Sequence, residues 1–141
     1  MKKVVYNASY GGYGLSPIAT YAIAKRKGLN PSIYIERENN LFQKINLNEL
    51  KYFDGDEDIF ISIKDVGDFF EGNLYNEDII YNAIDLPRTD KDLVSVVEDL
   101  AEKANGLHAN LRIKVVKDKY RILEYDGSET VETPESIMWL E

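Results

Sequence analysis

Residues 3–17, KVVYNASYGGYGLSP, show how the chain begins and which kind of fold it enters. Lys3–Ala8 is short and β-rich and runs into a stretch with three glycines, which predicts a buried strand followed by a loop. Ser16 and Pro17 then predict a helix N-cap and a proline at the first helical position, where its missing N–H costs nothing. A strand, a glycine loop and a helix therefore follow one another directly.

A second, longer helix is predicted between residues 89 and 106. Thr89 and Asp92 have the character of a capping box, and Gly106 is a stop signal at the far end. Apolar side chains recur between them at intervals of three and four, and the opposite face is charged, as is typical of a surface helix that packs through one stripe. The apolar positions are Leu93, Val96, Val97, Leu100, Ala101 and Ala104.

Alternation of apolar and polar residues predicts strands at Ser32–Arg37, Leu111–Val116 and Tyr120–Tyr125. The short connection at residues 117–119 predicts that the last two strands form a hairpin. An Asp-Gly turn follows, and Glu129–Thr133 is a candidate for a final short strand. With the helices, this pattern predicts an α+β fold in which two main helices pack on an antiparallel or mixed sheet.

Residues 39–80 have weaker patterns. Strand-like pieces at Ile59–Ile63 and Ile79–Tyr81 lie among acidic turns, which fits an insertion, a mobile flap or an irregular part of the sheet. A chain of 141 residues has the usual size of one domain. We therefore expect a single domain over residues 1–141, with 39–80 as a possible insertion or flap.

The charge balance restricts the partners of this chain. Its formal net charge of −8 argues against DNA, RNA and anionic membranes, which require a basic surface. A small anionic ligand is still compatible, because it contacts only a local pocket. No apolar run approaches the roughly 18 residues of a membrane span, and the absence of cysteine rules out disulfides and thiolate metal sites. We expect a cytoplasmic protein.

The glycine loop is the segment that most suggests ligand binding. Gly11, Gly12 and Gly14 would let backbone N–H groups approach a phosphate at the start of a helix, where negative charge is favoured. Tyr10 and Tyr13 could stack on a base. The spacing matches neither a Walker loop nor a dinucleotide-binding motif. A tight turn whose tyrosines pack on the core needs the same glycines, so both interpretations stay open.

The arginines are candidate anion clamps, since a guanidinium pairs with phosphate in a bidentate manner. Arg88 lies just before the cap of the second helix, and Arg112 and Arg121 lie on the two arms of the predicted hairpin. The alternative for each is a surface salt bridge with one of 25 carboxylates. The predicted ligand-binding residues are Asn7, Tyr10, Gly11, Gly12, Tyr13, Gly14, Ser16, Arg88, Arg112 and Arg121.

Signals for catalysis are scarce. His108, the only histidine, follows a predicted helix end, where a structural role is more common than that of a general base. The acidic residues within 54–58 lack the ligand spacing of an EF-hand and indicate a solvated turn. No nucleophile or metal motif is present. We predict no cofactor, no metal and a binding role, although paired carboxylates or a tyrosine could still catalyse.

Two blocks of the sequence resemble a family of small bacteriophage and large-virus proteins that mostly carry no assigned activity. Residues 4–16 are similar to that family's opening strand, Gly-Gly-aromatic turn and Leu-Ser cap. The block from Arg88 through Asn105-Gly106 and Leu111-Arg112 to Gly127 is similar to its closing part. Together the blocks cover somewhat over half of the chain, and residues 39–80 lie outside them.

The resemblance implies a viral protein acting in an infected cell. Such proteins include anti-defence sponges, which trap the nucleotide signals of bacterial immunity. Our leading hypothesis from the sequence is a sponge that sequesters a cyclic ADP-ribose-like or cyclic dinucleotide signal without turnover, in a pocket of residues 10–16 with Arg88 or Arg112 on the phosphates. A chain of this size is expected to form a homo-oligomer in order to build deep pockets.

Two alternatives belong to other classes. An acidic surface with ten tyrosines suits an inhibitor or adaptor that covers a basic patch on a host protein. A phosphodiesterase that degrades the same signals is the third hypothesis.

Overall fold

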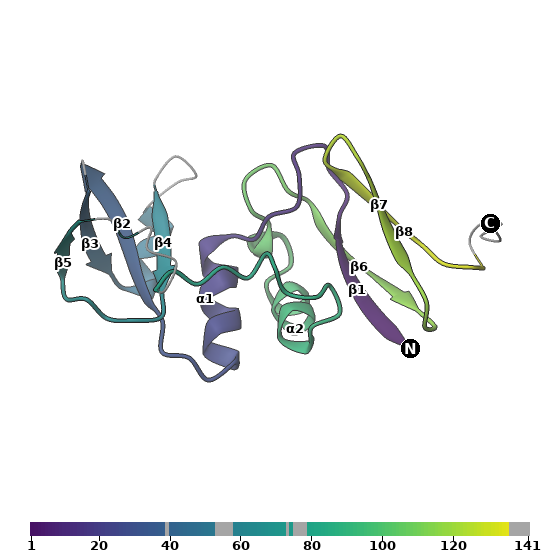
Figure 1. Cartoon of the computed structure of the whole chain (residues 1–141), viewed down its shortest axis with the longest axis horizontal. Helices are drawn as coiled ribbons and strands as arrows, with labels where there is room; N and C mark the ends of the chain where they lie inside the picture. Colours follow the sequence, from purple (N-terminus) through teal and green to yellow (C-terminus); the bar gives the residue numbers. More distant parts are fainter. Residues whose placement is uncertain (39, 53–57, 73, 75–78, 136–141) are drawn as a thin grey trace. The chain divides into compact units, whose positions relative to one another are not determined.

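The computed structural model describes residues 1–38, 40–52, 58–72, 74 and 79–135, and the chain divides into two compact units (Figure 1). The first unit comprises Met1–Ala19 and Ile84–Glu141, and the second comprises Thr20–Ala83. Both units contain antiparallel strands, and the described residues also form two α-helices, so the predicted α+β class is confirmed. None of the helices in the described part of the chain has the length and apolar character needed to traverse a bilayer.

The first unit is built on two antiparallel strand pairs. β1 (Lys2–Asn7) pairs with β6 (Leu111–Val116) along its whole length. β7 (Arg121–Tyr125) pairs with β8 (Ser128–Glu132). The alternation that predicted strands at these positions places apolar side chains in a shared core, formed by Val4, Val116 and Val131 with Tyr6, Tyr120 and Ile122 packed against it.

The predicted hairpin between Leu111–Val116 and Tyr120–Tyr125 is wrong. These strands follow each other in sequence but pair with β1 and β8, respectively. The hairpin forms instead at Asp126-Gly127, whose φ angles of 52° and 91° are the left-handed values that a two-residue turn requires. The Asp-Gly turn is therefore the stronger local signal, and the predicted last strand is confirmed as β8.

α2 (Lys91–Leu100) lies in this unit and packs against β1. Its N-cap is Asp90, so the predicted capping box at Thr89 is wrong. The Asp90 carboxylate accepts hydrogen bonds from the N–H groups of Asp92 and Leu93, each at 3.0 Å, because a short acidic side chain satisfies two exposed amides at once. The α-helix ends before Gly106, and a 3-10 turn, η2 (Ala101–Ala104), follows. Of the predicted apolar stripe, Leu93, Val96, Val97 and Ala104 are buried, whereas Ala101 is exposed beyond the end of the helix.

The second unit is a four-stranded antiparallel sheet in the order β4-β2-β3-β5. The strands are β2 (Ser32–Glu38), β3 (Leu41–Ile45), β4 (Ile59–Ser62) and β5 (Phe69–Glu71), with a 3-10 turn, η1 (Leu47–Tyr52), between β3 and β4. α1 (Pro17–Arg26) precedes the sheet, and Gly28, whose φ of 83° is left-handed, follows its last turn.

Residues 41–45, 59–62 and 69–71 are thus strands of one antiparallel sheet with β2. Both faces of this sheet carry buried apolar residues. One face carries Ile33, Ile35, Ile45 and Ile61, and the other carries Tyr34 and Phe42 with Leu74. In the predicted acidic turn, positions 54, 56 and 57 lie outside the described residues.

Candidate functional site

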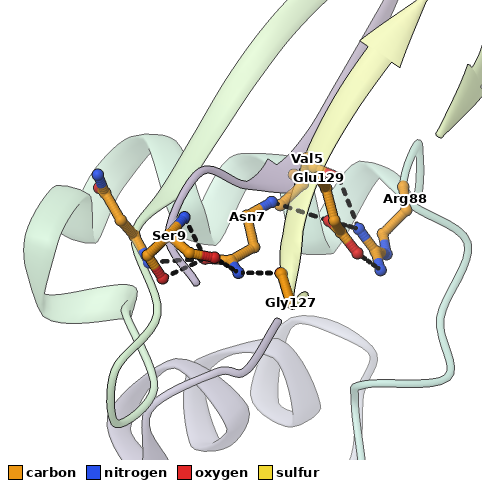
Figure 2. A network of polar contacts seen from close by, with 7 residues as sticks. Val5, Asn7, Ser9, Arg88, Gly127 and Glu129 are labelled. Carbon is orange, nitrogen blue, oxygen red and sulfur yellow. Dashed lines mark hydrogen bonds and ion pairs between the residues drawn. The ribbon is translucent and has the colours of Figure 1, made fainter. Parts of the chain in front are cut away.

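Asn7, the last residue of β1, is the centre of a buried polar network (Figure 2). Its side chain is 0% exposed. Nδ2 donates to the carbonyl oxygens of Ser9 and Gly127, each at 2.9 Å. Oδ1 accepts from the N–H of Asn110 at 2.8 Å and from the hydroxyl of Ser9 at 3.1 Å. The hydrogen-bonding capacity of the amide is fully used, so Asn7 ties three segments together.

Glu129 on β8 and Arg88, which precedes α2, form a bidentate ion pair beside Asn7 (Figure 2). The two nitrogen–oxygen distances are 2.7 and 2.9 Å. The carboxylate also accepts the backbone N–H of Asn7 at 2.9 Å, and Arg88 donates to the carbonyl of Val5 at 3.3 Å. The side chains of Arg88 and Glu129 are 21% and 8% exposed, so the pair is largely removed from water.

The electrostatics of this pair keep both groups charged at neutral pH. Burial raises the pKa of Glu129, but the hydrogen bonds from Arg88 and Asn7 and the charge of Arg88 outweigh it, and the net pKa is lowered. The guanidinium carbon of Arg88 lies 3.5 Å from the centroid of the Tyr13 ring, a cation–π contact. Burial raises the pKa of Tyr13 against the effect of Arg88, and the Tyr13 hydroxyl has no hydrogen-bond partner among the described residues.

The glycine–tyrosine loop, which we define as residues 8–16, approaches two other segments closely. A Cβ atom at Gly11 would collide with the backbone of His108. A Cβ atom at Gly127 would collide with the carbonyl of Tyr10. Glycine is required at both points because any other residue would push the segments apart. Gly11 therefore serves the packing of the loop, whereas a Cβ atom at Gly12 would meet open space. The tight-turn interpretation is wrong for Tyr10, whose side chain is exposed instead of packed on the core.

Several N–H groups of the loop are already bound by the chain itself. Their acceptors are the carbonyl of Asn110 for Ala8, the side chain of Asn7 for Ser9, the side chain of Ser9 for Gly11 and the carbonyl of Ala104 for Ser16. The carbonyl of Gly14 accepts from Gly106, which fixes the end of the loop. A phosphate would have to displace these acceptors in order to bind the same amides.

The remaining predicted residues do not form one cluster. Ser16 is the N-cap of α1, as predicted, because its hydroxyl accepts the N–H of Ala19 at 3.2 Å. Arg121 forms an ion pair with Glu132 at 2.9 Å. Arg112 is exposed on β6, opposite Tyr6. Since β6 and β7 are not hairpin partners, Arg112 and Arg121 do not converge as arms of one hairpin.

The tip of the loop is its accessible part. Tyr10 is 74% exposed, and Leu107 in the adjoining segment is 65% exposed. Gly11 and His108, which contact each other, are also exposed. We call the exposed residues Tyr10, Leu107 and His108 the loop-tip surface. Three surface hollows lined by described residues lie elsewhere, next to Glu38 and Glu71, along Leu100–Lys103, and between Lys2 and Lys91.

Glu129 is the residue of this network that sequence reasoning missed. A signal was present, because Glu129 and Val131 are two apart on a strand and share its inward face, where they are 9% and 3% exposed. A carboxylate at an inward position predicts a buried partner. Among the described residues, no group of three or more acidic or histidine side chains is placed to hold a metal ion.

Comparisons with protein-family models, curated proteins and solved structures give no match for this chain.

Proposed function

We propose that the chain is a binding protein that attaches to a basic surface of a partner protein through its loop-tip surface, as an inhibitor or adaptor. The observation that carries this proposal is the exposed side chain of Tyr10 on a loop that is held in place by the hydrogen bonds of Asn7 and Glu129. Tyrosine is enriched at protein interfaces because it combines apolar area with a polar tip. An anchored loop also loses little conformational entropy on binding.

Charge favours a basic partner. Asp126 is exposed in the turn whose Gly127 contacts the carbonyl of Tyr10, and Glu124 is exposed nearby in sequence. These carboxylates are part of a net charge of −8. Complementary charge accelerates the association of two proteins and selects between partners. A protein with a basic patch is therefore the class of partner that fits the carboxylates of Asp126 and Glu124.

Sequestration of a nucleotide is the second candidate, and two observations support it. Tyr10 is accessible for stacking, and Arg112 is exposed without an ion pair in the described part of the chain. Arg88 is less suitable, because both of its terminal nitrogens are bound to Glu129 and a phosphate would have to displace a buried carboxylate. This competition makes the protein partner the better supported proposal.

The proposal is tested with the immobilised protein and its Tyr10→Ala variant in lysate of bacterial cells, since the resemblance suggests a bacteriophage origin. Phe69→Ala is the matched control, because Phe69 is also an exposed aromatic residue (62%) but lies in the second unit. We expect a stoichiometric protein on the wild type and on Phe69→Ala that is lost from Tyr10→Ala. Equal retention by Tyr10→Ala would contradict the proposal.

Calorimetry separates the second candidate from the first. ADP-ribose derivatives and cyclic dinucleotides are titrated into the wild type and into Arg112→Gln. We expect no saturable heat from either protein. A saturable heat that Arg112→Gln loses would favour nucleotide sequestration instead, and recovery of cleaved ligand would indicate a phosphodiesterase.

A further inference from the structure

β7 is an edge strand. It pairs with β8 on one side, and no other described strand pairs with its opposite side. An uncovered edge presents backbone N–H and C=O groups that can pair with another strand.

The turn determines which groups of β7 point outward. In a two-residue hairpin the residues that flank the turn, here Tyr125 and Ser128, form a hydrogen-bonded pair. Because hydrogen-bonded and non-bonded pairs alternate, the N–H and C=O groups of Ile122 and Glu124 point away from β8. The same alternation directs the carbonyl of Val131 away from β7. That carbonyl accepts a hydrogen bond from Lys114 at 3.2 Å, in agreement with this alternation.

The outward face of β7 carries side chains that are accessible. Leu123 is 46% exposed and Tyr125 is 74% exposed. Arg121 lies on the same face, with a side chain that is 40% exposed. This face is therefore a row of a cation, an aliphatic residue and an aromatic residue, with Leu123 in the middle.

We propose that two copies of this chain pair through β7 in antiparallel orientation, about a two-fold axis at Leu123. This register places Leu123 opposite the partner's Leu123 as a non-hydrogen-bonded pair, in which side chains approach most closely. Arg121 lies opposite the partner's Tyr125, where a cation–π contact is possible. Ile122 and the partner's Glu124 form the hydrogen-bonded pairs on either side.

A second copy fits this edge because the row is complementary to itself when it is reversed. The register does not place Arg121 opposite the partner's Arg121 or Glu124 opposite the partner's Glu124, so like charges are kept apart. A two-fold pairing also closes, and it joins two hairpins into a four-stranded ribbon without growing into a fibre. Tyr10 and Leu107 lie outside the paired strand, so each dimer would present two loop-tip surfaces.

A cysteine placed on the axis tests this register. The chain contains no cysteine, so Leu123→Cys introduces a single thiol. Facing residues of an antiparallel pair have Cβ atoms about 4.5–5.5 Å apart, close to the separation in a disulfide. Val115→Cys is the matched control, because Val115 is an exposed apolar strand residue (54%) on β6. We expect Leu123→Cys to form a covalent dimer at least about tenfold faster than Val115→Cys under mild oxidation.

Light scattering of the wild type provides the second measurement. We expect a dimer mass that falls toward the 16.2 kDa of the monomer on dilution, and a monomer for Leu123→Lys. Thr130→Lys is the control for folding, since Thr130 is exposed opposite Leu123 on β8, and it should stay dimeric. A wild type that is monomeric at all concentrations, or equal cross-linking rates for the two cysteine variants, would overturn the proposal.

Discussion

Each unit of the molecule contains an ion pair that ties a loop to a strand, and the two differ in burial. In the first unit, Arg88 and Glu129 are 21% and 8% exposed. In the second, Lys44 and Asp65 are 30% and 58% exposed, at a nitrogen–oxygen distance of 2.7 Å. The bond lengths are alike, so distance alone does not distinguish them. A buried pair is strongly coupled to folding, whereas water screens an exposed one.

The hydrogen-bond networks around these two ion pairs also differ in the sequence separation of the residues they join. Glu129 accepts a backbone N–H from Asn7, which is 122 residues away in sequence. The hydroxyl of Tyr34 binds Asp65 and Gly67, which are 31 and 33 residues away. The first network joins both ends of its unit and sets the position of the glycine–tyrosine loop. The second fastens one neighbouring loop, so we expect its loss to have a local effect.

Asn7→Ala is expected to have the largest effect. It leaves several buried backbone groups without partners, which should lower the free energy of unfolding by about 3 kcal/mol or more. Chemical denaturation followed by circular dichroism measures this difference. Asn30→Ala, at an exposed position in the second unit, is the control and should change stability by less than about 0.5 kcal/mol. Similar values for the two variants would mean that the Asn7 network is not essential to folding.

Glu129→Gln comes next. The amide keeps the shape of the side chain but leaves the charge of Arg88 without a counter-charge, so we expect a loss of about 3 kcal/mol in the free energy of unfolding. Glu132→Gln is the matched control on the same strand. Glu132 binds Arg121, whose side chain is 40% exposed, and a loss of at most about 1 kcal/mol is expected there. Equal losses of unfolding free energy in the two variants would contradict the expected effect of burial.

The acid dependence of stability tests the same pair without a new side chain. The pKa of Glu129 is lower in the folded protein than its ordinary value of about 4.3. Its contribution is therefore complete above that ordinary value and is lost as the pH falls through the folded pKa. We expect the difference in unfolding free energy between the wild type and Glu129→Gln to shrink below about pH 4.3. A difference that stays constant from pH 7 to pH 3 would contradict this assignment.

Tyr13→Phe is expected to have a smaller effect, and in the opposite direction. The hydroxyl of Tyr13 is buried without a hydrogen-bond partner in the described part of the chain, so its removal should stabilise the protein by about 1 kcal/mol. The ring stays in place beneath the guanidinium of Arg88. Thermal melting measures the gain, and Tyr13→Ala, which removes the ring as well, should be less stable than the wild type. A destabilised Tyr13→Phe would show that the hydroxyl has a partner in solution.

Lys44→Met should have the smallest effect. Lys44 contacts Asp65 on an exposed surface, and such pairs contribute little because both ions are hydrated when apart. We expect no measurable change in the denaturation midpoint at physiological salt. A loss comparable to that of Glu129→Gln would show that exposure is a poor guide to the strength of these pairs.

The local parts of the structure were predictable from the residues. β1, β2, both helices and the cap at Ser16 follow from alternation, periodicity and capping, which act over a few neighbouring residues. The glycines of the loop were recognised, but their purpose was not. Gly11 allows contact with His108, and Gly127 allows contact with Tyr10, and because these partners are distant in sequence, no local pattern distinguishes this role from phosphate binding.

The amino-acid sequence by itself determined the α+β class, the acidic character and the approximate positions of β1, β2, β6, β7, β8 and both helices, because short-range sterics and hydrogen bonding decide these. Only the tertiary structure decided that β6 pairs with β1, that Glu129 binds Arg88, and that Tyr10 faces solvent while Tyr13 lies under a guanidinium. Such choices depend on which of many compatible strands and charges meet when the core is buried. That selection is made by packing over the whole unit, and neighbouring residues do not encode it.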